Sequence, residues 1–317
     1  MKPQVLLSGS SGLIGSALRH QLAQSGYPCR QLVRRPARTA EELEWHPESG
    51  RGPDPALLRG AEIAIHLSGA NISAGRWTDA RKRELVASRV APTRALASAL
   101  CQTEPRPRVL VCASAIGIYG DRGDELLDEN STPGQGFLPE TCLAWEAAAA
   151  EAAQCGVRVV SVRFGIVLSP KGGALAKMLP LFRLGLGGPL GHGRQWMSWI
   201  SLEDVVYALI FLGQRALEDP SAPPVEAVNV VAPNPVRNID FTCQLGQTLH
   251  RPAILPAPAF ALRLVFGEMA DQTLLASARV VPARLQQKGF EFRHPTLVEA
   301  LGHALQSPPG SDTLSRR

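Results

Sequence analysis

The sequence is poor in several residue types and patterns that mark particular classes of protein. Aromatic residues make up only 5% of its 317 residues, and only three of them are tyrosines. Only five lysines are present, and the basic residues behind the net charge of +5 are scattered, which does not favour nucleic-acid binding. No apolar run reaches the roughly 18 residues that a membrane-spanning helix needs. We therefore expect a cytoplasmic protein that binds neither nucleic acid nor membrane.

The cysteine pattern excludes another set of sites. None of the six cysteines forms a C-x-x-C pair, so we expect reduced, mostly buried thiols and no metal centre. A strand pattern begins almost at the first residue, which predicts that there is no signal peptide. Residues 307–317 are rich in Pro, Ser and Gly and are predicted to be disordered.

Apolar runs of strand length alternate with helical patterns through the first 230 residues. Such alternation predicts parallel strands joined by right-handed crossovers, and hence a doubly wound α/β sheet of the Rossmann type. The predicted strands are Val5–Ser8, Cys29–Val33, Ala61–Leu67, Val109–Ala113, Val157–Arg163 and Ala227–Val231. The predicted helices are Leu13–Gln24, Asp79–Leu100 with an interruption near Pro92, Glu140–Gln154 and Asp204–Leu217.

The pattern changes after about residue 169, where loops lengthen and glycines cluster. We predict a dinucleotide-binding domain made of residues 1–168 and 202–232. Residues 169–201 and 233–306 are predicted to form a smaller, mostly helical C-terminal lobe that holds the substrate. Such a lobe would lie over the carboxyl ends of the strands, where sheets of this type bind ligands.

The stretch GSSGLIG follows the first predicted strand and opens the first predicted helix. Its glycines, Gly9, Gly12 and Gly15, allow a tight turn and a close approach of backbone to ligand. The helix N-terminus offers free N–H groups and a partial positive charge to a pyrophosphate. We predict that the whole turn binds a dinucleotide, through Gly9, Ser10, Ser11, Gly12, Leu13, Ile14 and Gly15.

The second strand indicates which dinucleotide. An NAD site usually has an Asp or Glu there, but CRQLVRRPAR contains no acid. It offers Arg34 and Arg35 instead, with Arg30 and Arg38 nearby. Guanidinium groups at this place suit a 2′-phosphate, so we predict NADP(H) rather than NAD.

Six longer stretches carry a resemblance to a known family. They are LLSGSSGLIGSAL, HLSGANISAGRWTDARKRELVASRVAPTRAL, ASAIGIYGD, WEAAA, NVVAPNPVRNIDF and VRFGIVLSPKGGALAKMLPLFRLGLGGPLGHGRQWMSWISLEDV. The sequence resembles the extended short-chain dehydrogenase/reductase superfamily, and within it an atypical epimerase-like branch sometimes labelled cell-division-inhibitor-like. The resemblance covers nearly the whole chain and implies an NADP(H)-binding Rossmann domain with a small C-terminal domain over the active cleft.

The resemblance also implies roles for single residues. Leu67, Ser68 and Gly69 would lie beside the ribose and phosphates of the cofactor, and Ser114 would match the catalytic serine of the superfamily. Arg163, Phe164 and the backbone around Val167 would approach the nicotinamide. Lys82 lies in a helix whose start is expected to approach the cofactor. Arg163 has an equally good interpretation as a buried structural cation.

The usual proton-transfer pair of such dehydrogenases, Tyr-x-x-x-Lys, is missing. None of the three tyrosines is followed by a lysine four residues later. In the register set by WEAAA, Thr141 and Trp145 stand where the Tyr and Lys are expected. Threonine cannot supply a phenolate, and tryptophan has one neutral donor and no charge.

Other residues are candidates for the vacant role. Tyr119 lies one loop beyond Ser114 and is expected to face the cleft, with a proton-donor role as one hypothesis. Glu146 is interpreted as a surface or structural carboxylate. Candidates for the substrate pocket are Gly117, His192, Arg194, Gln195 and Trp196.

Two kinds of function stay open at this point. One is an NADP(H)-dependent oxidoreductase, favoured over an epimerase, which acts on an unidentified small polar substrate. The other is a non-catalytic NADP(H)-binding sensor or scaffold, with a link to cell division as one form of it. The sequence is compatible with a monomer or a homodimer.

Overall fold

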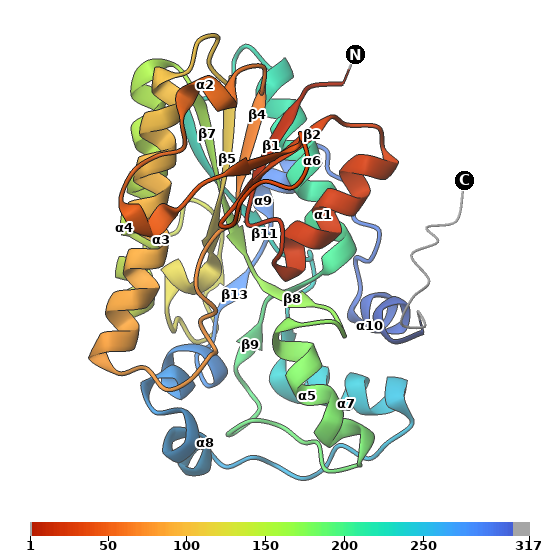
Figure 1. Cartoon of the computed structure of the whole chain (residues 1–317). Coiled ribbons are helices and arrows are strands. Elements are labelled where there is room, and N and C mark those ends of the chain that lie inside the picture. Colours follow the sequence, from red (N-terminus) through yellow and green to blue (C-terminus); the bar gives the residue numbers. More distant parts are fainter. Residues whose placement is uncertain (1, 307–317) are drawn as a thin grey trace.

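A seven-stranded parallel sheet forms the centre of the molecule in the computed structural model, which describes residues 2–306 (Figure 1). The strand order is β11-β7-β5-β4-β1-β2-β3, and every neighbouring pair is parallel. The strands are β1 (Val5–Ser8), β2 (Cys29–Val33), β3 (Glu42–Glu44), β4 (Ile63–His66), β5 (Val109–Ala115), β7 (Arg158–Phe164) and β11 (Val225–Val230). The predicted doubly wound sheet is confirmed.

Helices cover both faces of this sheet (Figure 1). On one face, α1 (Leu13–Gln24) and α6 (Leu202–Glu218) pack against each other and against the odd-numbered residues of β1, β4 and β5. On the other face, α3 (Asp79–Gln102) and α4 (Phe137–Ala150) pack on the even-numbered residues. Apolar side chains point to both faces of the central strands because these strands are buried on both sides, which is why β1 and β5 are largely continuous apolar runs.

Two details of this layer differ from the prediction. Helix α3 runs unbroken through Pro92, which is buried against the sheet. The hydroxyl of Thr93 donates to the carbonyl oxygen of Arg89 there, and packing of Leu96 and Leu100 holds the helix together across the proline. The edge strand β3 was not predicted.

Shorter helices in this part of the chain are η1 (Pro47–Ser49), α2 (Pro55–Leu58), η2 (Ile116–Tyr119) and η3 (Glu151–Cys155).

Most of the remaining elements gather below the carboxyl ends of the strands (Figure 1). They are β6 (Leu126–Leu127), β8 (Ile166–Leu168), α5 (Gly173–Arg183), β9 (Trp196–Met197), β10 (Trp199–Ser201), β12 (Val236–Arg237), α7 (Asn238–Leu249), α8 (Ala259–Phe266), the π-helix η4 (Ala270–Leu274), β13 (Arg279–Val280) and α10 (Leu297–Gln306). They have their own apolar core, which includes Leu179, Trp199 and Phe241. Helix α9 (Ala283–Gln287) lies beside β11 of the large sheet. Two residues from this part of the chain, Leu285 and Phe290, pack instead in the core of the large sheet.

The expectation that all cysteines are reduced is wrong for two of them. Cys101, at the end of α3, and Cys155, in η3, form a disulfide. They are 54 residues apart in sequence, so no spacing motif announces the pair. Cys112 and Cys142 are buried free thiols, as expected, whereas the free thiol of Cys243 is exposed.

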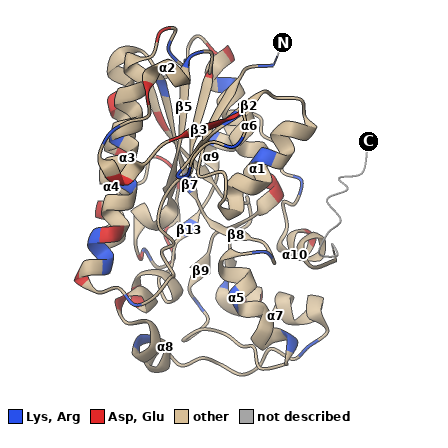
Figure 2. Cartoon of the chain, viewed as in Figure 1, with Lys and Arg blue, Asp and Glu red and all other residues tan. Residues whose placement is uncertain are grey.

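Charged residues are distributed without a single basic stripe in the view of Figure 2, where α3 carries both acidic and basic residues. Among residues 2–306, no helix combines the length and apolar character needed to cross a membrane. The predicted disordered segment, residues 307–317, lies outside the described residues.

His66, the last residue of β4, is a buried base that should make folding sensitive to pH. Its side chain is fully buried, 6.2 Å from the ring of Trp45, and neither ring nitrogen has a hydrogen-bond partner among the described residues. Burial lowers the pKa of His66 to about 4. Between that value and the ordinary histidine pKa of about 6.5, the unfolded chain binds a proton that the folded chain does not, so stability falls as pH falls.

We therefore expect His66 to remove about 2 kcal/mol from the free energy of unfolding between about pH 7 and about pH 5. Urea unfolding of the wild type and of His66→Phe at both pH values measures this contribution, because the other titrating groups cancel in the comparison. His20→Gln, at an exposed histidine of α1, is the matched control and should keep the wild-type pH dependence. An identical pH dependence in His66→Phe and the wild type would contradict the assignment.

Candidate functional site

A cavity of about 540 Å³ lies at the carboxyl ends of the central strands. Residues of β9 and of the π-helix η4 close it from the other side. Parallel strands end at one edge of the sheet, so residues that follow β1, β4, β5 and β7 meet there. Its lining includes Gly9 and Gly12–Gly15, Leu67–Gly69, Ala113–Gly117, Phe164–Val167, Trp196–Ser198 and Gln272–Thr273. Helices α3 and α4 add Arg89, Leu138, Thr141, Cys142 and Trp145.

The glycine turn is built so tightly that side chains do not fit at two of its positions. Gly9 has φ +81°, and a Cβ atom on it would lie 2.8 Å from the backbone carbon of Leu67. A Cβ on Gly15 would lie 2.1 Å from the carbonyl oxygen of Gly9. Gly12 is the N-cap of α1 and has no side chain to cap it. The first N–H groups of the helix, which have no acceptor within it, therefore face the cavity and suit a phosphate.

The arginines after β2 are not equivalent. Arg35 donates to both carboxylate oxygens of Glu42, at 2.7 and 2.5 Å. These bonds hold the pKa of Glu42 at about 2, so the carboxylate stays charged and compensates Arg35. Arg34 is exposed and makes no hydrogen bond or ion pair within residues 2–306. Of the two predicted phosphate ligands, Arg34 is the one that no carboxylate binds directly, although its charge helps to lower the pKa of Glu48.

Ser114 lies near the end of β5 and is held by a buried ion pair. Its hydroxyl donates to Oε1 of Glu146 on α4 at 2.7 Å. Arg163 on β7 donates to the same oxygen at 2.8 Å and to Oε2 at 2.9 Å. Burial alone would lower the pKa of Arg163, but the bonds to Glu146 outweigh it and raise that pKa. The hydroxyl proton of Ser114 is thus directed at Glu146, which leaves its oxygen lone pairs for the cavity.

The structure corrects the predictions for Tyr119 and Arg163. Tyr119 is fully buried and does not line the cavity; its hydroxyl donates to Asn229 at 2.8 Å and accepts from Arg163 at 3.0 Å. Burial raises its pKa, so Tyr119 is a structural phenol and not a proton donor to the cleft. Arg163 likewise lies behind the lining, as the buried structural cation that was its alternative interpretation.

Thr141 and Trp145, at the positions of the missing pair, do line the cavity. The hydroxyl of Thr141 donates to the carbonyl oxygen of Phe137 at 2.6 Å, and the indole N–H of Trp145 donates to Thr93 at 3.0 Å. Both groups therefore donate their protons to acceptors within the protein and not to a ligand. Cys142, between them on the same helix, also lines the cavity, and burial raises the pKa of its thiol to about 12.

Of the five predicted pocket residues, the structure places two in the cavity lining and three outside it. Gly117 and Trp196 line the cavity, and the indole N–H of Trp196 donates to Asp124 at 2.8 Å. His192 and Arg194 are exposed and lie outside the lining. Gln195 is buried, and its amide nitrogen donates to the carbonyl oxygens of Leu190 and Leu274. The pocket assignments of His192, Arg194 and Gln195 are therefore corrected, because their side chains point into solvent or hold loops together.

Lys82 is also not where its prediction placed it. Its ammonium group forms an ion pair with Glu268 and lies 5.4 Å from the centre of the Phe137 ring, outside the cavity lining. Ser10 and Ser11 belong to the glycine turn but do not line the cavity. Ser68 does, and its hydroxyl lies 2.6 Å from that of Ser8.

Sequence reasoning missed the contribution of Arg89 and of the π-helix η4. Arg89 lies in the charge-rich helix α3, where nothing in the pattern distinguishes it from its exposed neighbours. Gln272 and Thr273 come from η4, and the side-chain oxygen of Gln272 accepts from the backbone N–H of Leu138 at 3.2 Å. This bond ties the C-terminal part to the start of α4 across the cavity. Single-turn π-helices often mark functional sites, but their sequence signal is weak.

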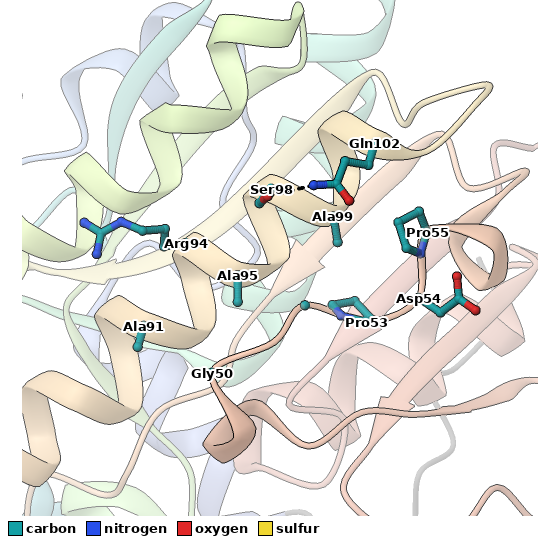
Figure 3. Close-up of a pocket in the computed structure, with 11 residues that line it drawn as sticks. Gly50, Pro53, Asp54, Pro55, Ala91, Arg94, Ala95, Ser98, Ala99 and Gln102 are labelled. Atoms are coloured by element: carbon teal, nitrogen blue, oxygen red, sulfur yellow. Dashed lines mark hydrogen bonds between the residues drawn. The ribbon is translucent and has the colours of Figure 1, made fainter.

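A second hollow, of about 580 Å³, lies between α3 and the segment 50–55 (Figure 3). Its two charged side chains are already used: Arg94 pairs with Glu151 at 2.7 Å, and Asp54 caps α2 through the N–H of Ala56. The remaining groups are mostly small residues of α3. It is remote from the glycine turn and offers no chemistry.

One cluster in the described part of the chain brings three metal-ligand side chains together: Glu203, His294 and His303, whose ligand atoms lie within 4.8 Å of one another. Arg293 donates to Glu203 at 3.2 Å and brings a competing positive charge. We interpret the cluster as an ionic tie between the start of α6 and α10.

The sheet order, the glycine turn and the cavity at the carboxyl ends define a Rossmann-type α/β protein. The sequence profile described as the NAD dependent epimerase/dehydratase family matches residues 5–230, and that of a domain of unknown function (DUF1731) matches residues 257–304. The chain belongs to the NAD dependent epimerase/dehydratase family.

Named relatives cover almost the whole chain. Epimerase family protein Mb2239 of Mycobacterium bovis is 45% identical, over 96% of this chain and 98% of that protein. The chloroplastic SDR39U1 homolog of Arabidopsis thaliana, also called an epimerase family protein, is 37% identical, over 95% and 86%. The crystal structure of human epimerase family protein SDR39U1 (isoform 2) with NADPH superposes with a TM-score of 0.84, at 32% identity, covering 95% of this chain and 98% of that one.

Proposed function

We propose that this protein binds NADP(H) in the cavity and reduces a small polar substrate placed against Ser114. The cofactor part rests on the glycine turn, whose missing side chains leave room for a phosphate, and on the exposed Arg34, which forms no ion pair within residues 2–306. The human relative solved with NADPH supports it. When bound, the cofactor supplies a hydride, and the protein has to orient the substrate and handle one proton.

The observation that carries the catalytic part is the Ser114–Glu146–Arg163 arrangement. Arg163 keeps Glu146 in place through two bonds, and Glu146 keeps the Ser114 hydroxyl in one orientation. The Ser114 oxygen can then accept a hydrogen bond from a substrate hydroxyl or a water in the cavity, while it donates its own proton to a carboxylate oxygen that lies 2.7 Å from it. Reduction of a carbonyl consumes one proton, and the Glu146 carboxylate, which is ion-paired with Arg163, has none to give. A water that donates one hydrogen bond to the Ser114 oxygen would give its other proton to the substrate oxygen, and bulk water would replace it.

The side chains that line the cavity make epimerisation the weaker alternative. Within the described lining, Thr141, Cys142 and Trp145 offer no free acid or base to abstract a proton reversibly from a sugar hydroxyl. A non-catalytic NADP(H) sensor or scaffold is the second candidate function. It is favoured by the same finding, that the donor groups at both positions of the missing pair bond within the fold.

Oxidation of NADPH, followed by the absorbance of the reduced nicotinamide with a panel of carbonyl and enone compounds, separates the two candidates. We expect turnover of at least one compound and a fall in kcat/KM of about 100-fold or more in Ser114→Ala. Ser161→Ala, at a buried serine on the neighbouring strand β7, should retain wild-type turnover. Intact NADPH binding without turnover of any compound would favour the sensor.

Arg34 and Arg35 give a separate test of the cofactor. Arg34→Ala is expected to weaken NADPH binding about 10-fold or more, because a charge-assisted bond to the 2′-phosphate is worth about 1.5–3 kcal/mol. NADH binding should be unchanged, since NADH has no such phosphate. Arg35→Ala is the matched control and should have the smaller effect, because Glu42 already compensates Arg35. Titration by fluorescence measures both; equal losses for NADPH and NADH in Arg34→Ala would contradict the assignment.

A further inference from the structure

The cluster of Glu203, His294 and His303 has the donor set of a transition-metal site. One carboxylate and two imidazoles are a combination that Zn²⁺ uses in proteins, with its fourth position left for water. Oε2 of Glu203 lies 2.9 Å from Nε2 of His294 and 3.3 Å from Nε2 of His303, so both imidazoles converge on one carboxylate oxygen. The expectation of no metal centre was drawn from the cysteines, and no cysteine takes part in this cluster.

The distances within the cluster are close to those around a bound zinc ion. Zinc bonds of about 2.0–2.1 Å hold the ligand atoms of a tetrahedral site about 3.3 Å apart. Both distances to Oε2 of Glu203 are near this value, and the three ligand atoms all lie within 4.8 Å of one another. The two imidazole rings are stacked with their centres 4.5 Å apart, so one ring has to rotate to aim both nitrogens at a single point. The side chain of His303 is 45% exposed, which leaves it room for this rotation.

A buried neighbour of Glu203 fixes the backbone that carries His294. The side chain of Asp204 is fully buried, and its carboxylate accepts from the backbone N–H groups of Arg293 at 2.7 Å and of His294 at 3.2 Å. Ser201 donates to the same carboxylate at 2.8 Å. Two of the three ligands therefore lie on backbone segments that are held together before any ion binds, which lowers the cost of binding.

Arg293 is the positive charge that competes with a cation at this place, and its contacts keep it to one side. Its guanidinium group donates to Oε1 of Glu203 at 3.2 Å, whereas both imidazoles lie nearest to Oε2. It also lies over the ring of Tyr207, with its central carbon 3.7 Å from the ring centre. A hydrogen bond to a ligating carboxylate is usual in metal sites, where it orients the ligand. Because the side chain of Arg293 is 48% exposed, water screens much of its repulsion.

We propose that Glu203, His294 and His303 bind a Zn²⁺ ion that clamps α10 to the start of α6. Without the ion the cluster is the ionic tie described above, and with it two neutral imidazoles and one carboxylate share a dication. None of the three residues lines the cavity, so this inference is independent of the proposed function. The ion is structural: α10 already packs in the apolar core of the C-terminal part through Leu297 and Leu301, and the metal bonds add to that packing.

Titration of the EDTA-treated, untagged full chain with Zn²⁺ tests the proposal. We expect calorimetry to show one Zn²⁺ per chain with a Kd of about 1 μM or tighter. Zn²⁺ should also raise the midpoint of thermal unfolding, because it binds the folded chain. Co²⁺ in its place should give the strong visible absorption of a four-coordinate ion, which Zn²⁺ then removes. In His303→Gln the affinity for Zn²⁺ should fall about 100-fold or more, and the thermal shift should disappear.

His46→Gln and Cys243→Ser are the matched controls. His46 is another histidine bonded to carboxylates, but Glu44 and Glu48 lie on its two different ring nitrogens, so the three groups cannot share one ion. Cys243 is an exposed free thiol that could capture Zn²⁺ by itself. Both control variants should bind Zn²⁺ as the wild type does; a loss in either that equals the loss in His303→Gln would place the ion elsewhere and overturn the proposal.

The wild type alone can also contradict the proposal. No binding of Zn²⁺ below about 100 μM would overturn it, as would wild-type affinity in a folded His303→Gln variant. If His303→Gln does not fold, the Co²⁺ spectrum of the wild type decides without any variant. The weak bands of a six-coordinate ion, or no bands beyond those of free Co²⁺, would then show that the cluster is an ionic tie and nothing more.

Discussion

Replacement of Gly15 by alanine should weaken NADPH binding by at least about 100-fold while the chain still folds. The added Cβ atom would lie 2.1 Å from the carbonyl oxygen of Gly9 and 2.9 Å from the Cα of Ser10, both parts of the backbone. The turn has to move away from the start of α1, and the N–H groups that face the cavity move with it. Calorimetric titration measures the affinity, and circular dichroism on heating shows that the fold persists.

The control for this change is Gly302→Ala in α10. Gly302 is also a helical glycine, but the nearest atom to an added Cβ lies 4.0 Å away, at the end of the Gln306 side chain. We expect NADPH binding as in the wild type and a small gain in stability of about 0.5–1 kcal/mol, because alanine is the better helix former. Wild-type affinity in a folded Gly15→Ala variant would show that the turn does not hold the cofactor.

Replacement of Glu146 by glutamine should have the largest effect on stability. The side chains of Arg163 and Glu146 are only 10% and 15% exposed, so removal of the carboxylate charge leaves a buried guanidinium uncompensated. The new amide N–H₂ group also faces donors of Arg163 rather than acceptors. We expect the free energy of unfolding to fall by about 3 kcal/mol, measured by urea unfolding near neutral pH.

Glu151→Gln is the matched control for Glu146→Gln. Glu151 pairs with Arg94 at 2.7 Å, but these side chains are 40% and 56% exposed, so water screens the pair. The expected loss is under about 1 kcal/mol. Equal losses in the two variants would mean that the Ser114–Glu146–Arg163 arrangement is not the buried, tightly coupled unit described above.

The parts of the fold that were predicted correctly depend on local patterns. Strands such as Val5–Ser8 and Val109–Ala115 are buried on both faces, so they stand out as apolar runs. The glycine turn was recognisable because a backbone that approaches so closely tolerates only glycine. The resemblance to the dehydrogenase superfamily singled out Ser114, and the structure places this residue in the cavity lining.

The parts that were missed depend on partners far apart in the sequence. Tyr119 was assigned to the cleft from its place one loop beyond Ser114, but its acceptor, Asn229, lies 110 residues away on the edge strand β11. The pairing of Arg163 with Glu146 and of Arg35 with Glu42 decides which arginines are compensated, and neither pairing follows from residue type. Arg89 is one of several basic residues in α3, and only the packing of α3 against α4 turns it toward the cavity.

The absence of the Tyr-x-x-x-Lys pair separates cofactor binding from catalysis in this chain. The residues that favour NADP(H) follow β1 and β2 and begin α1, whereas the catalytic proposal depends on Ser114 and on the carboxylate of Glu146 behind it. Cofactor binding and catalysis can therefore be tested separately, and the proposed reduction requires that NADP(H) binds first.

Calorimetric titration of the wild-type protein with NADPH, and with NADH under the same conditions, tests the binding of NADP(H) most directly. We expect one NADPH per chain, bound at least about 10-fold more tightly than NADH, because Arg34 meets a phosphate that NADH lacks. No heat of binding with NADPH, or an equal or tighter affinity for NADH, would contradict it.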